Sequence, residues 1–358
     1  MTIVIILLIT MQYAIIAKAS YPNCMPGSTC FKLKPYVNTH WLFDCAAINT
    51  TKEVKGNILF LHGNDGPRSK GMWSMMMQAF ADKGYNTLAF DQRGFSPEAS
   101  PYLQSEYNYD KLADDIFAIA DIYWGVSSKF HLVAHDQGAR LGWHAIALGT
   151  ARKRYLSYTP LSEAHSDAFS DALYGPNTDQ AQQTSFMYLW SFTLPGNSTL
   201  AYQSNIWKVV CKAFNHYATP ALCQPSIWWY SGAVESGNLA MQPFSTWGQI
   251  GKQIGIPEDY IKNHTTYPLE GHPQTKKVGN VTEFPVMYVC GIGDYADKCN
   301  NRFRDETAKY IKDFHYYRSM NCGHDLVSTG CKDYQTVIDN IVHFVENVWK
   351  GKFLPGTK

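Results

Sequence analysis

The sequence predicts an α/β fold in which a mostly parallel central sheet is flanked by helices and interrupted by a helical insertion. Apolar runs of strand length lie at 57–61, 85–90, 130–134, 284–290 and 314–318. Apolar residues at helical spacing lie at 109–123, 139–148, 302–312 and 334–349. Strands that alternate with helices, and that are apolar on both faces, are typical of a parallel sheet covered by helices.

The two halves of this pattern are separated by a segment of different composition. Residues 156–275 are rich in Trp and Tyr, are broken by Gly and Pro, and lack clear strands. We therefore expect a helical cap (lid) over 156–275, inserted into an α/β core that comprises residues 20–155 and 276–358.

The N-terminus carries the features of a signal peptide. Apolar residues from Ile3 to Ile9 and, after Met11-Gln12-Tyr13, from Ala14 to Ile16 precede Ala17-Lys18-Ala19, which is an A-x-A cleavage site. We expect residues 1–19 to be removed on secretion, and an uncleaved membrane anchor is the alternative. No later stretch is long and apolar enough to span a bilayer, so we expect no stable membrane insertion after cleavage.

Charge and cysteine content narrow the functional classes. The formal net charge is +1, and Lys and Arg are spread along the chain, which argues against a nucleic-acid partner. Nine cysteines and four N-glycosylation sequons fit an oxidising secretory route that ends outside the cell or within that pathway. The sequons are at Asn49, Asn197, Asn263 and Asn280.

An odd number of cysteines leaves at least one unpaired. Local loops can be closed by Cys211 with Cys223 and by Cys322 with Cys331, and two further bridges can be drawn from Cys24, Cys30, Cys45 and Cys299. Cys290 lies inside an apolar run, and we expect it to be the buried free thiol with a packing role.

A candidate nucleophile follows the strand at 130–134. Ala134-His135-Asp136-Gln137-Gly138 leads from this strand into a helical run. This small-x-nucleophile-x-small arrangement is typical of a nucleophile elbow, in which small flanking residues permit a strained turn that projects the middle side chain. The alternative is an ordinary Asp that caps the helix. The pattern favours Asp136 as the nucleophile.

Two further candidates follow later strands. Gly291-Ile292-Gly293-Asp294 comes after the strand at 284–290, and Asn321-Cys322-Gly323-His324-Asp325 comes after the last strand. Sites in open parallel sheets lie at the carboxyl ends of strands. The order nucleophile, acid, histidine therefore predicts Asp294 as the acid and His324 as the base. Asp297 is the alternative acid if the loop is shifted.

With these motifs, residues 55–350 resemble the epoxide hydrolase and haloalkane dehalogenase branch of the α/β-hydrolase superfamily. His62-Gly63-Asn64-Asp65 resembles the H-G-x-P oxyanion loop of that branch, and Asp91-Gln92-Arg93-Gly94-Phe95-Ser96 resembles its D-x-R-G-x-G/S turn. Asp65 replaces the usual Pro and Ala134 replaces the usual Gly. The resemblance implies an α/β-hydrolase fold with a catalytic carboxylate.

In this chemistry a carboxylate displaces at an sp³ carbon and leaves an ester on its own side chain. The resemblance implies that Asp136 forms the ester and that His324, oriented by Asp294, activates the water that hydrolyses it. The backbone amides of Asn64 and Gln137 would hold the resulting oxyanion.

Epoxide hydrolases also place two tyrosines on the cap, one in a Y-x-x-x-F-x-x-P-G string and one in a W-Y-R string. Residues 188–196 match the first string, and Trp229-Tyr230-Ser231 matches the second in part. The resemblance implies that Tyr188 and Tyr230 donate hydrogen bonds to the alkoxide that forms when the ring opens. A phenol with a pKa of about 10 stays protonated at neutral pH and can do so.

Other functions are compatible with the same residues. A haloalkane or haloacid dehalogenase would use the same nucleophile, but haloalkane dehalogenases place Trp where this chain has Gln137, and fluoroacetate dehalogenases carry His where Tyr188 falls. A catalytically inactive secreted binding protein on the same fold is the alternative from another class. The favoured hypothesis is hydrolysis of a small hydrophobic epoxide without a cofactor or a metal, because metal-ligand spacings and a Gly-rich phosphate loop are absent from the sequence.

Overall fold

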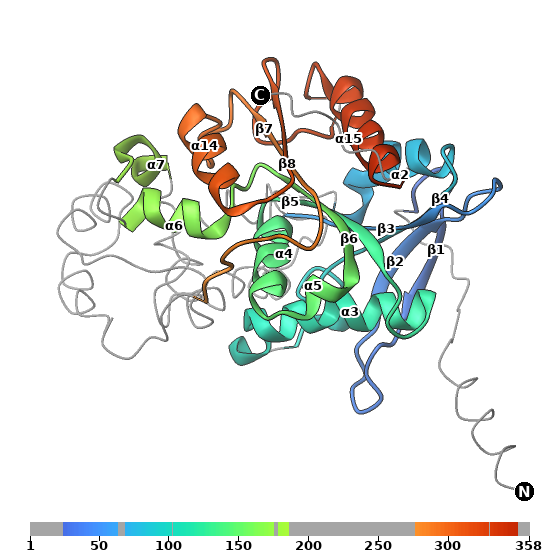
Figure 1. Ribbon diagram of the computed structural model, residues 1–358. Coiled ribbons are helices and arrows are strands. Elements are labelled where there is room, and N and C mark those ends of the chain that lie inside the picture. Colours follow the sequence, from blue (N-terminus) through green and yellow to red (C-terminus); the bar gives the residue numbers. More distant parts are fainter. Residues whose placement is uncertain are drawn as a thin grey trace, which may run out of the picture.

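The computed structural model describes residues 24–63, 69–101, 103–174, 178–185, 276–328 and 330–349. Within these residues the strands form one eight-stranded sheet in the order β1-β2-β4-β3-β5-β6-β7-β8 (Figure 1). The strands are β1 (Thr29–Leu33), β2 (Phe43–Ile48), β3 (Gly56–Leu61), β4 (Tyr85–Phe90), β5 (Phe130–His135), β6 (Tyr155–Leu161), β7 (Val286–Gly291) and β8 (Phe314–Ser319). Strand β2 pairs antiparallel with both β1 and β4, and every other pairing is parallel. The expected mostly parallel α/β sheet is confirmed.

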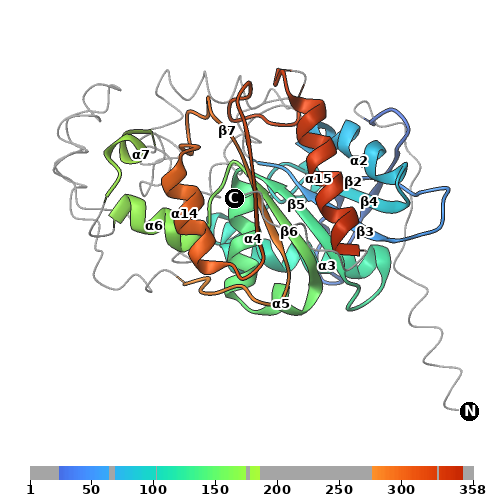
Figure 2. The same cartoon turned by 45° about the horizontal axis from the view of Figure 1, so that its top comes forward.

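Helices cover both faces of the sheet (Figures 1 and 2). One face carries α2 (Ser74–Ala81) and α15 (Tyr334–Trp349), and the other carries α3 (Tyr109–Trp124), α4 (Gln137–Ala147) and α5 (Thr150–Arg154). Three further helices, α6 (Ser166–Tyr174), α7 (Gln180–Ser185) and α14 (Asn301–Tyr310), lie together beyond the β7 and β8 side of the sheet. The segments predicted as helices at 109–123, 139–148, 302–312 and 334–349 correspond to α3, α4, α14 and α15.

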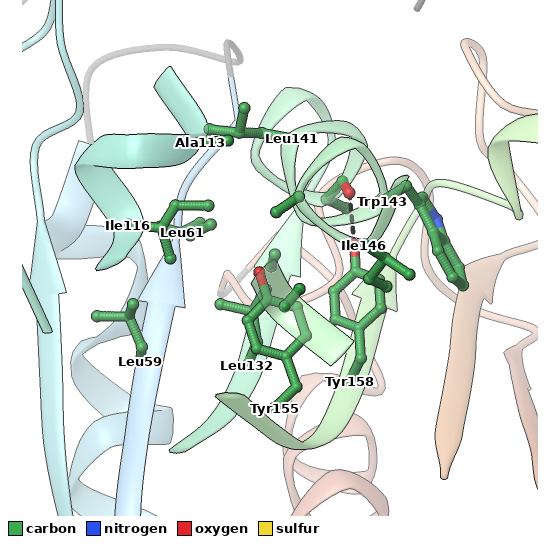
Figure 3. Packing of buried hydrophobic residues seen from close by; sticks show 14 of the residues in the cluster. Leu59, Leu61, Ala113, Ile116, Leu132, Leu141, Trp143, Ile146, Tyr155 and Tyr158 are labelled. Carbon is green, nitrogen blue, oxygen red and sulfur yellow. Dashed lines mark hydrogen bonds between the residues drawn. The ribbon is translucent and has the colours of Figure 1, made fainter. Parts of the chain in front are cut away.

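Strand β3 shows why the central strands read as continuous apolar runs. Leu59 and Leu61 belong to the core beneath α3 and α4, where Leu141 of α4 also lies (Figure 3). Ile58 and Phe60 alternate with them and belong to the core beneath α2 and α15. Because successive strand residues point to opposite faces, burial of both faces requires an apolar residue at every position. Each fully buried side chain of this size stabilises the fold by about 1.5–3 kcal/mol.

One strand lies where the sequence suggested the start of the insertion. Tyr155–Leu161 forms β6, which is paired between β5 and β7, so the sheet continues past the expected core boundary at residue 155. The strand was missed because it contains Ser157, Thr159 and Pro160 instead of an apolar run. Inside the protein Ser157 is satisfied by a hydrogen bond to His131 Nδ1 of 2.8 Å, so its polarity does not require exposure. Residues 186–275, which hold most of the expected cap, lie outside the described residues.

The disulfides correct one expectation from the cysteines. Cys290 is not a free thiol: it is bonded to Cys299, because the loop after β7 turns back and brings the two Cα atoms to 5.5 Å. Cys24–Cys30 and the expected Cys322–Cys331 bridge are also present. Cys45, which we grouped with the bridging cysteines, is the buried free thiol among the described residues. It lies in the fully buried strand β2. Cys211 and Cys223 lie outside the described residues.

Two of the four sequons lie in the described part of the chain, and both Asn49 and Asn280 are exposed. Asn197 and Asn263 lie outside it, as do residues 1–19. Among the described helices, none combines the length and the apolar character that a membrane crossing requires.

Candidate active site

The site is built on the bend between β5 and α4. Asp136 connects the last residue of β5 to the first residue of α4 with φ 50° and ψ −123°. A non-glycine residue in this sparsely populated region costs of order 1–3 kcal/mol and persists only when its surroundings impose it. Here Asp136 N–H donates to Leu161 O at 3.1 Å, and Arg140 N–H donates to Asp136 O at 2.9 Å. The carboxylate is thereby presented at the carboxyl edge of the sheet.

Gly138 is the small residue that allows this bend to approach β3. A Cβ atom added to Gly138 would lie 2.4 Å from the carbonyl oxygen of His62 and 2.8 Å from that of Leu61. Both are backbone atoms that cannot move aside independently. The start of α4, which carries the Gln137 amide, is therefore held against the end of β3, where the expected oxyanion loop begins.

His324 joins the two carboxylates predicted from the sequence. Its Nδ1 lies 2.9 and 3.0 Å from the two carboxylate oxygens of Asp294, and its Nε2 lies 3.3 Å from Asp136 Oδ2. All three side chains are buried, with residue exposures of 5% for His324, 3% for Asp294 and 8% for Asp136. The structure thus brings together three residues that lie after β5, β7 and β8, in the arrangement of nucleophile, base and orienting acid.

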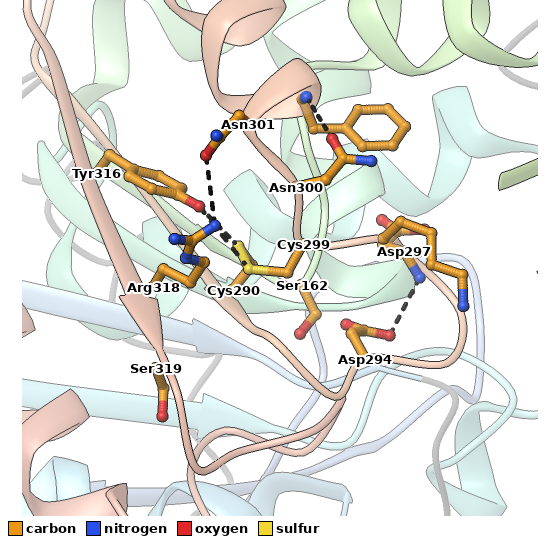
Figure 4. The surroundings of a disulfide bond; sticks show 12 residues. Ser162, Cys290, Asp294, Asp297, Cys299, Asn300, Asn301, Tyr316, Arg318 and Ser319 are labelled. Carbon is orange, nitrogen blue, oxygen red and sulfur yellow. Dashed lines mark hydrogen bonds between the residues drawn. A yellow bond between two sulfur atoms is a disulfide. The ribbon is translucent and has the colours of Figure 1, made fainter. Parts of the chain in front are cut away.

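Gly291, Gly293 and Gly323 allow the loop after β7, which carries Asp294, to contact the loop after β8, which carries His324. A Cβ atom on Gly291 would lie 2.2 Å from Gly323 O, and one on Gly293 would lie 3.3 Å from Cys322 O. The two backbones are also linked by the Gly293 N–H, which donates to Cys322 O at 3.0 Å. Asp294 lies on the loop that the Cys290–Cys299 disulfide closes (Figure 4). This close approach brings the Asp294 carboxylate within reach of the imidazole.

The electrostatics of the site favour a charged imidazole in the resting protein. Burial alone would lower the pKa of His324, but the negative charge of Asp294 and the hydrogen bond to Asp136 outweigh it and hold this pKa well above its usual value. An imidazolium flanked by two carboxylates is the result. The pKa depends on both partners, so loss of either negative charge lowers it.

Asp297, the alternative acid, has a different environment. Its N–H donates to Asp294 Oδ1 at 3.1 Å, and its own carboxyl group hydrogen-bonds to Glu163. Arg140 Nη2 donates to Glu163 at 2.6 Å, and all three side chains are buried. Burial and the charge of Glu163 raise the pKa of Asp297 well above its usual value. The geometry identifies Asp294 as the carboxylate that contacts His324.

The expected oxyanion hole is described in part. Gln137 is the first residue of α4, and the N–H groups of a first helical turn have no partner within the helix. Its side chain accepts a hydrogen bond from the hydroxyl of Tyr109. Asn64 lies outside the described residues, but His62 fixes the end of β3 before it: the Gln92 N–H donates to His62 Nε2 at 2.9 Å, and His62 Nδ1 lies 2.8 Å from Gly63 O.

The remaining sequence candidates, Tyr188 and Tyr230, lie outside the described residues. Several neighbours of the site were not anticipated: Tyr109, Glu163, His135 and Ser162. Glu163 and Ser162 directly follow β6, and recognition of that strand would have placed them at the same edge of the sheet. Within the described part of the chain, no group of three or more His, Cys, Asp or Glu side chains is arranged to hold a metal ion.

Comparison with known proteins agrees with the α/β fold described above. A family model described as the alpha/beta hydrolase fold matches residues 56–169. The AB hydrolase superfamily protein YfhM of Bacillus subtilis is 27% identical over 168 residues, which cover 46% of this chain and 54% of that protein. Epoxide hydrolase B of Mycobacterium tuberculosis is 34% identical over 86 residues (24% of this chain, 23% of that protein). Epoxide hydrolase 3 of Mus musculus is 38% identical over 87 residues (24% and 22%).

Solved structures extend the likeness over most of the chain. An epoxide hydrolase from metagenomes of hot environments has a TM-score of 0.58 at 19% identity and covers 86% of this chain and 95% of that one. An epoxide hydrolase of Bacillus megaterium in complex with an inhibitor has a TM-score of 0.58 at 18% identity, covering 87% and 99%. At these identities the likeness shows the fold.

The chain therefore carries an α/β-hydrolase domain. The curated relatives and structural neighbours to which it is similar include epoxide hydrolases. The alignments span about half or less of the length of the curated relatives described above.

Proposed function

We propose that the protein hydrolyses an epoxide to a vicinal diol through a covalent ester on Asp136. The observation that carries this proposal is the contact of His324 with two carboxylates, Asp136 at 3.3 Å and Asp294 at 2.9 Å. A carboxylate at the elbow is suited to displacement at an sp³ carbon, which an epoxide provides. The names of the relatives support the same substrate class.

In the first step an Asp136 oxygen attacks a ring carbon, and the bond from that carbon to the epoxide oxygen breaks. The departing oxygen becomes an alkoxide and needs a proton. We propose that the cap tyrosines Tyr188 and Tyr230 hydrogen-bond to this oxygen and that one of them supplies the proton. The products of this step are a hydroxyalkyl ester and a phenolate that is reprotonated later.

In the second step water attacks the Asp136 ester carbon while His324 accepts a proton. The charge on Asp136 disappears when the ester forms. Because that carboxylate helps to hold the His324 pKa high, ester formation lowers this pKa, so the imidazolium releases its proton to solvent and the neutral imidazole becomes available to accept a proton from the attacking water. Formation of the Asp136 ester therefore prepares His324 to activate the water that hydrolyses this ester. The Gln137 and Asn64 amides would stabilise the oxyanion, whose collapse releases the diol and restores Asp136.

Contacts of two neighbouring side chains favour epoxide hydrolysis over dehalogenation. The side-chain oxygen of Gln137, which stands where haloalkane dehalogenases place Trp, is engaged by the hydroxyl of Tyr109. A haloacid would need a cation for its carboxylate, yet the buried guanidinium of Arg140 is already matched by Glu163 at 2.6 Å. A neutral, hydrophobic epoxide requires neither a Trp at position 137 nor a cation for a carboxylate. The reaction requires no cofactor because nucleophile, base and proton donors are all side chains.

We also propose that the protein is secreted after cleavage near Ala19 and that it is glycosylated. The disulfides and the exposed positions of Asn49 and Asn280 support this compartment. N-terminal sequencing of protein secreted by eukaryotic cells, with and without enzymatic deglycosylation, tests it. An intact Met1 on the mature protein would contradict it.

The activity is tested with styrene oxide as a hydrophobic probe epoxide. Wild-type protein should form the diol and Asp136→Ala should not. Asp325→Ala removes an exposed carboxylate next to His324 and serves as the matched control, which should retain activity. Halide release from a haloalkane without diol formation would instead favour a dehalogenase. Failure of both reactions in folded wild-type protein would favour the inactive binding protein.

A further inference from the structure

The backbone carbonyl of His324 accepts two side-chain hydrogen bonds. His135 Nε2 lies 2.8 Å from His324 O, and Ser162 Oγ donates to the same oxygen at 2.9 Å. A carbonyl oxygen can only accept, so His135 carries its proton on Nε2 in this contact. Both donors are fully buried, with exposures of 0%, and the acceptor residue is buried as well. Water therefore does not compete for these hydrogen bonds.

The two donors come from strands that are distant from β8 within the sheet. His135 ends β5 and Ser162 follows β6, whereas His324 follows β8, and β7 lies between. The loop after β8 thus reaches back across β7 to the elbow. The imidazole rings of His135 and His324 also pack together, with centroids 4.9 Å apart.

The backbone at Ser162 is held in an unusual conformation that aims its hydroxyl. Ser162 has φ 56°, and its N–H donates to Val289 O of β7 at 2.8 Å. Serine in this region is strained, which glycine would relieve. Its hydroxyl nevertheless meets a carbonyl on a loop that is 162 residues away in sequence. The strained backbone of Ser162 is thus held by its N–H and places its hydroxyl against the His324 carbonyl.

We propose that His135 and Ser162 are positioning residues that fix the catalytic histidine through its own carbonyl. This inference rests on the proposed function, in which His324 activates water against the Asp136 ester. The Asp294 contact sets the rotation of the imidazole, but it cannot fix where the backbone of His324 lies. The two donors hold that backbone from the side of the β5–α4 bend, so Asp136 and His324 keep their relative positions.

Loss of both donors leaves the His324 carbonyl free to shift away from the elbow. A misplacement of about 1 Å can slow a reaction by about 10²-fold. Ester formation needs only Asp136 and the proton donors, so its rate should be unchanged. Ester hydrolysis should fall roughly tenfold in each single variant and about 100-fold in the double variant.

The variants separate the hydrogen bonds from packing and strain. His135→Gln places an amide N–H near the position of Nε2, whereas His135→Met removes the donor at similar size. Ser162→Ala and Ser162→Gly both remove the hydroxyl, but only glycine relieves the positive φ. Ser127→Ala is the matched control, because Ser127 also has a positive φ of 65° and lies away from the site.

Two readouts apply to each variant: single-turnover rates of ester formation and hydrolysis, and the downfield imidazole N–H proton resonance of His324 in the resting protein. We expect slow hydrolysis and a shifted or broadened resonance in His135→Met, Ser162→Ala and Ser162→Gly. His135→Gln and Ser127→Ala should behave like wild type. Wild-type hydrolysis in the donor-less variants, or recovery in Ser162→Gly, would overturn the inference.

The resonance keeps this test distinct from that of the proposed function. If wild-type protein forms no diol, the proposed function fails, but the effect of His135 and Ser162 on His324 is still measured without substrate. An unchanged resonance in both His135→Met and Ser162→Ala would then overturn the positioning role. Should the double variant fail to fold, the single variants and their spectra decide the question.

Discussion

Gly138→Ala, which adds one methyl group, should lower activity far more than a substitution elsewhere in α4 with a similar cost in stability. In Gly138→Ala the new Cβ would lie 2.4 Å from His62 O, whereas an ordinary contact is at least 3.4 Å. The start of α4 must therefore move away from β3 by about 1 Å, the difference between these distances. This motion carries Asp136 and the Gln137 amide away from the loop after β3. A shift of that size is expected to lower kcat for diol formation by about 10²-fold.

The matched control lies one turn further along the same helix. A Cβ on Gly142 would meet the hydroxyl of Tyr158 at 2.6 Å, which is the end of a side chain and not backbone. Figure 3 shows Tyr158 beneath α4, where its hydroxyl donates to Ala139 O. Gly142→Ala should lose about 1–3 kcal/mol of unfolding free energy, the usual cost of overpacking, yet retain its kcat.

Both variants are measured by steady-state hydrolysis of styrene oxide and by urea unfolding. The reasoning predicts a similar loss of stability in the two variants and a loss of kcat confined to Gly138→Ala. A folded Gly138→Ala protein with wild-type kcat would refute the claim that the contact between α4 and β3 sets the site. Equal losses of kcat in both variants would refute it as well.

Further predictions concern pH, redox state and the acid. Burial lowers the pKa of His131 to about 3, so below about pH 6.5 the unfolded chain binds a proton at this side chain and the folded protein does not. The free energy of unfolding should therefore fall by about 2 kcal/mol from pH 7 to pH 5. In urea unfolding, His131→Gln should lose about 2 kcal/mol less than wild type over this range. Reduction of the Cys290–Cys299 disulfide, which brackets Asp294, should slow ester hydrolysis before the protein unfolds, as followed by activity and near-UV circular dichroism during thiol titration. Asp294→Asn should lower the His324 pKa and reduce the rate of ester hydrolysis by roughly 10³–10⁴-fold. The covalent ester should then accumulate and be visible in intact-mass spectra. Rapid ester hydrolysis in this variant would mean that another residue serves as the acid.

The central strands were predictable because both of their faces are buried. β3, β4, β5 and β7 read as apolar runs for this reason, and their ends directed attention to the site. β1, β2 and β6 were not recognised, since Lys32, Asp44 and Ser157 interrupt their patterns. Their polar side chains are matched by partners on other strands: the Asp44 carboxylate lies 3.8 Å from Lys32 Nζ of β1, and Ser157 bonds to His131 of β5. A pattern of residue types does not reveal such partners.

The same limit applies to the site. Asp136, Asp294 and His324 were identifiable because each directly follows a strand and the three keep a fixed order. His135 and Ser162 act through the carbonyl of His324, which lies 189 and 162 residues away in sequence. A backbone acceptor has no residue signature, so only the folded structure reveals these hydrogen bonds.

The most direct test of the covalent Asp136 ester is a single turnover in ¹⁸O-labelled water with enzyme in excess over epoxide. Water attacks the carboxyl carbon of Asp136 in this mechanism, so the first turnover should place ¹⁸O in the Asp136 side chain and leave the diol unlabelled. Mass spectrometry of the peptide that contains Asp136 measures the label. Label in the diol alone would mean that water attacks the epoxide directly, and it would contradict Asp136 as the nucleophile.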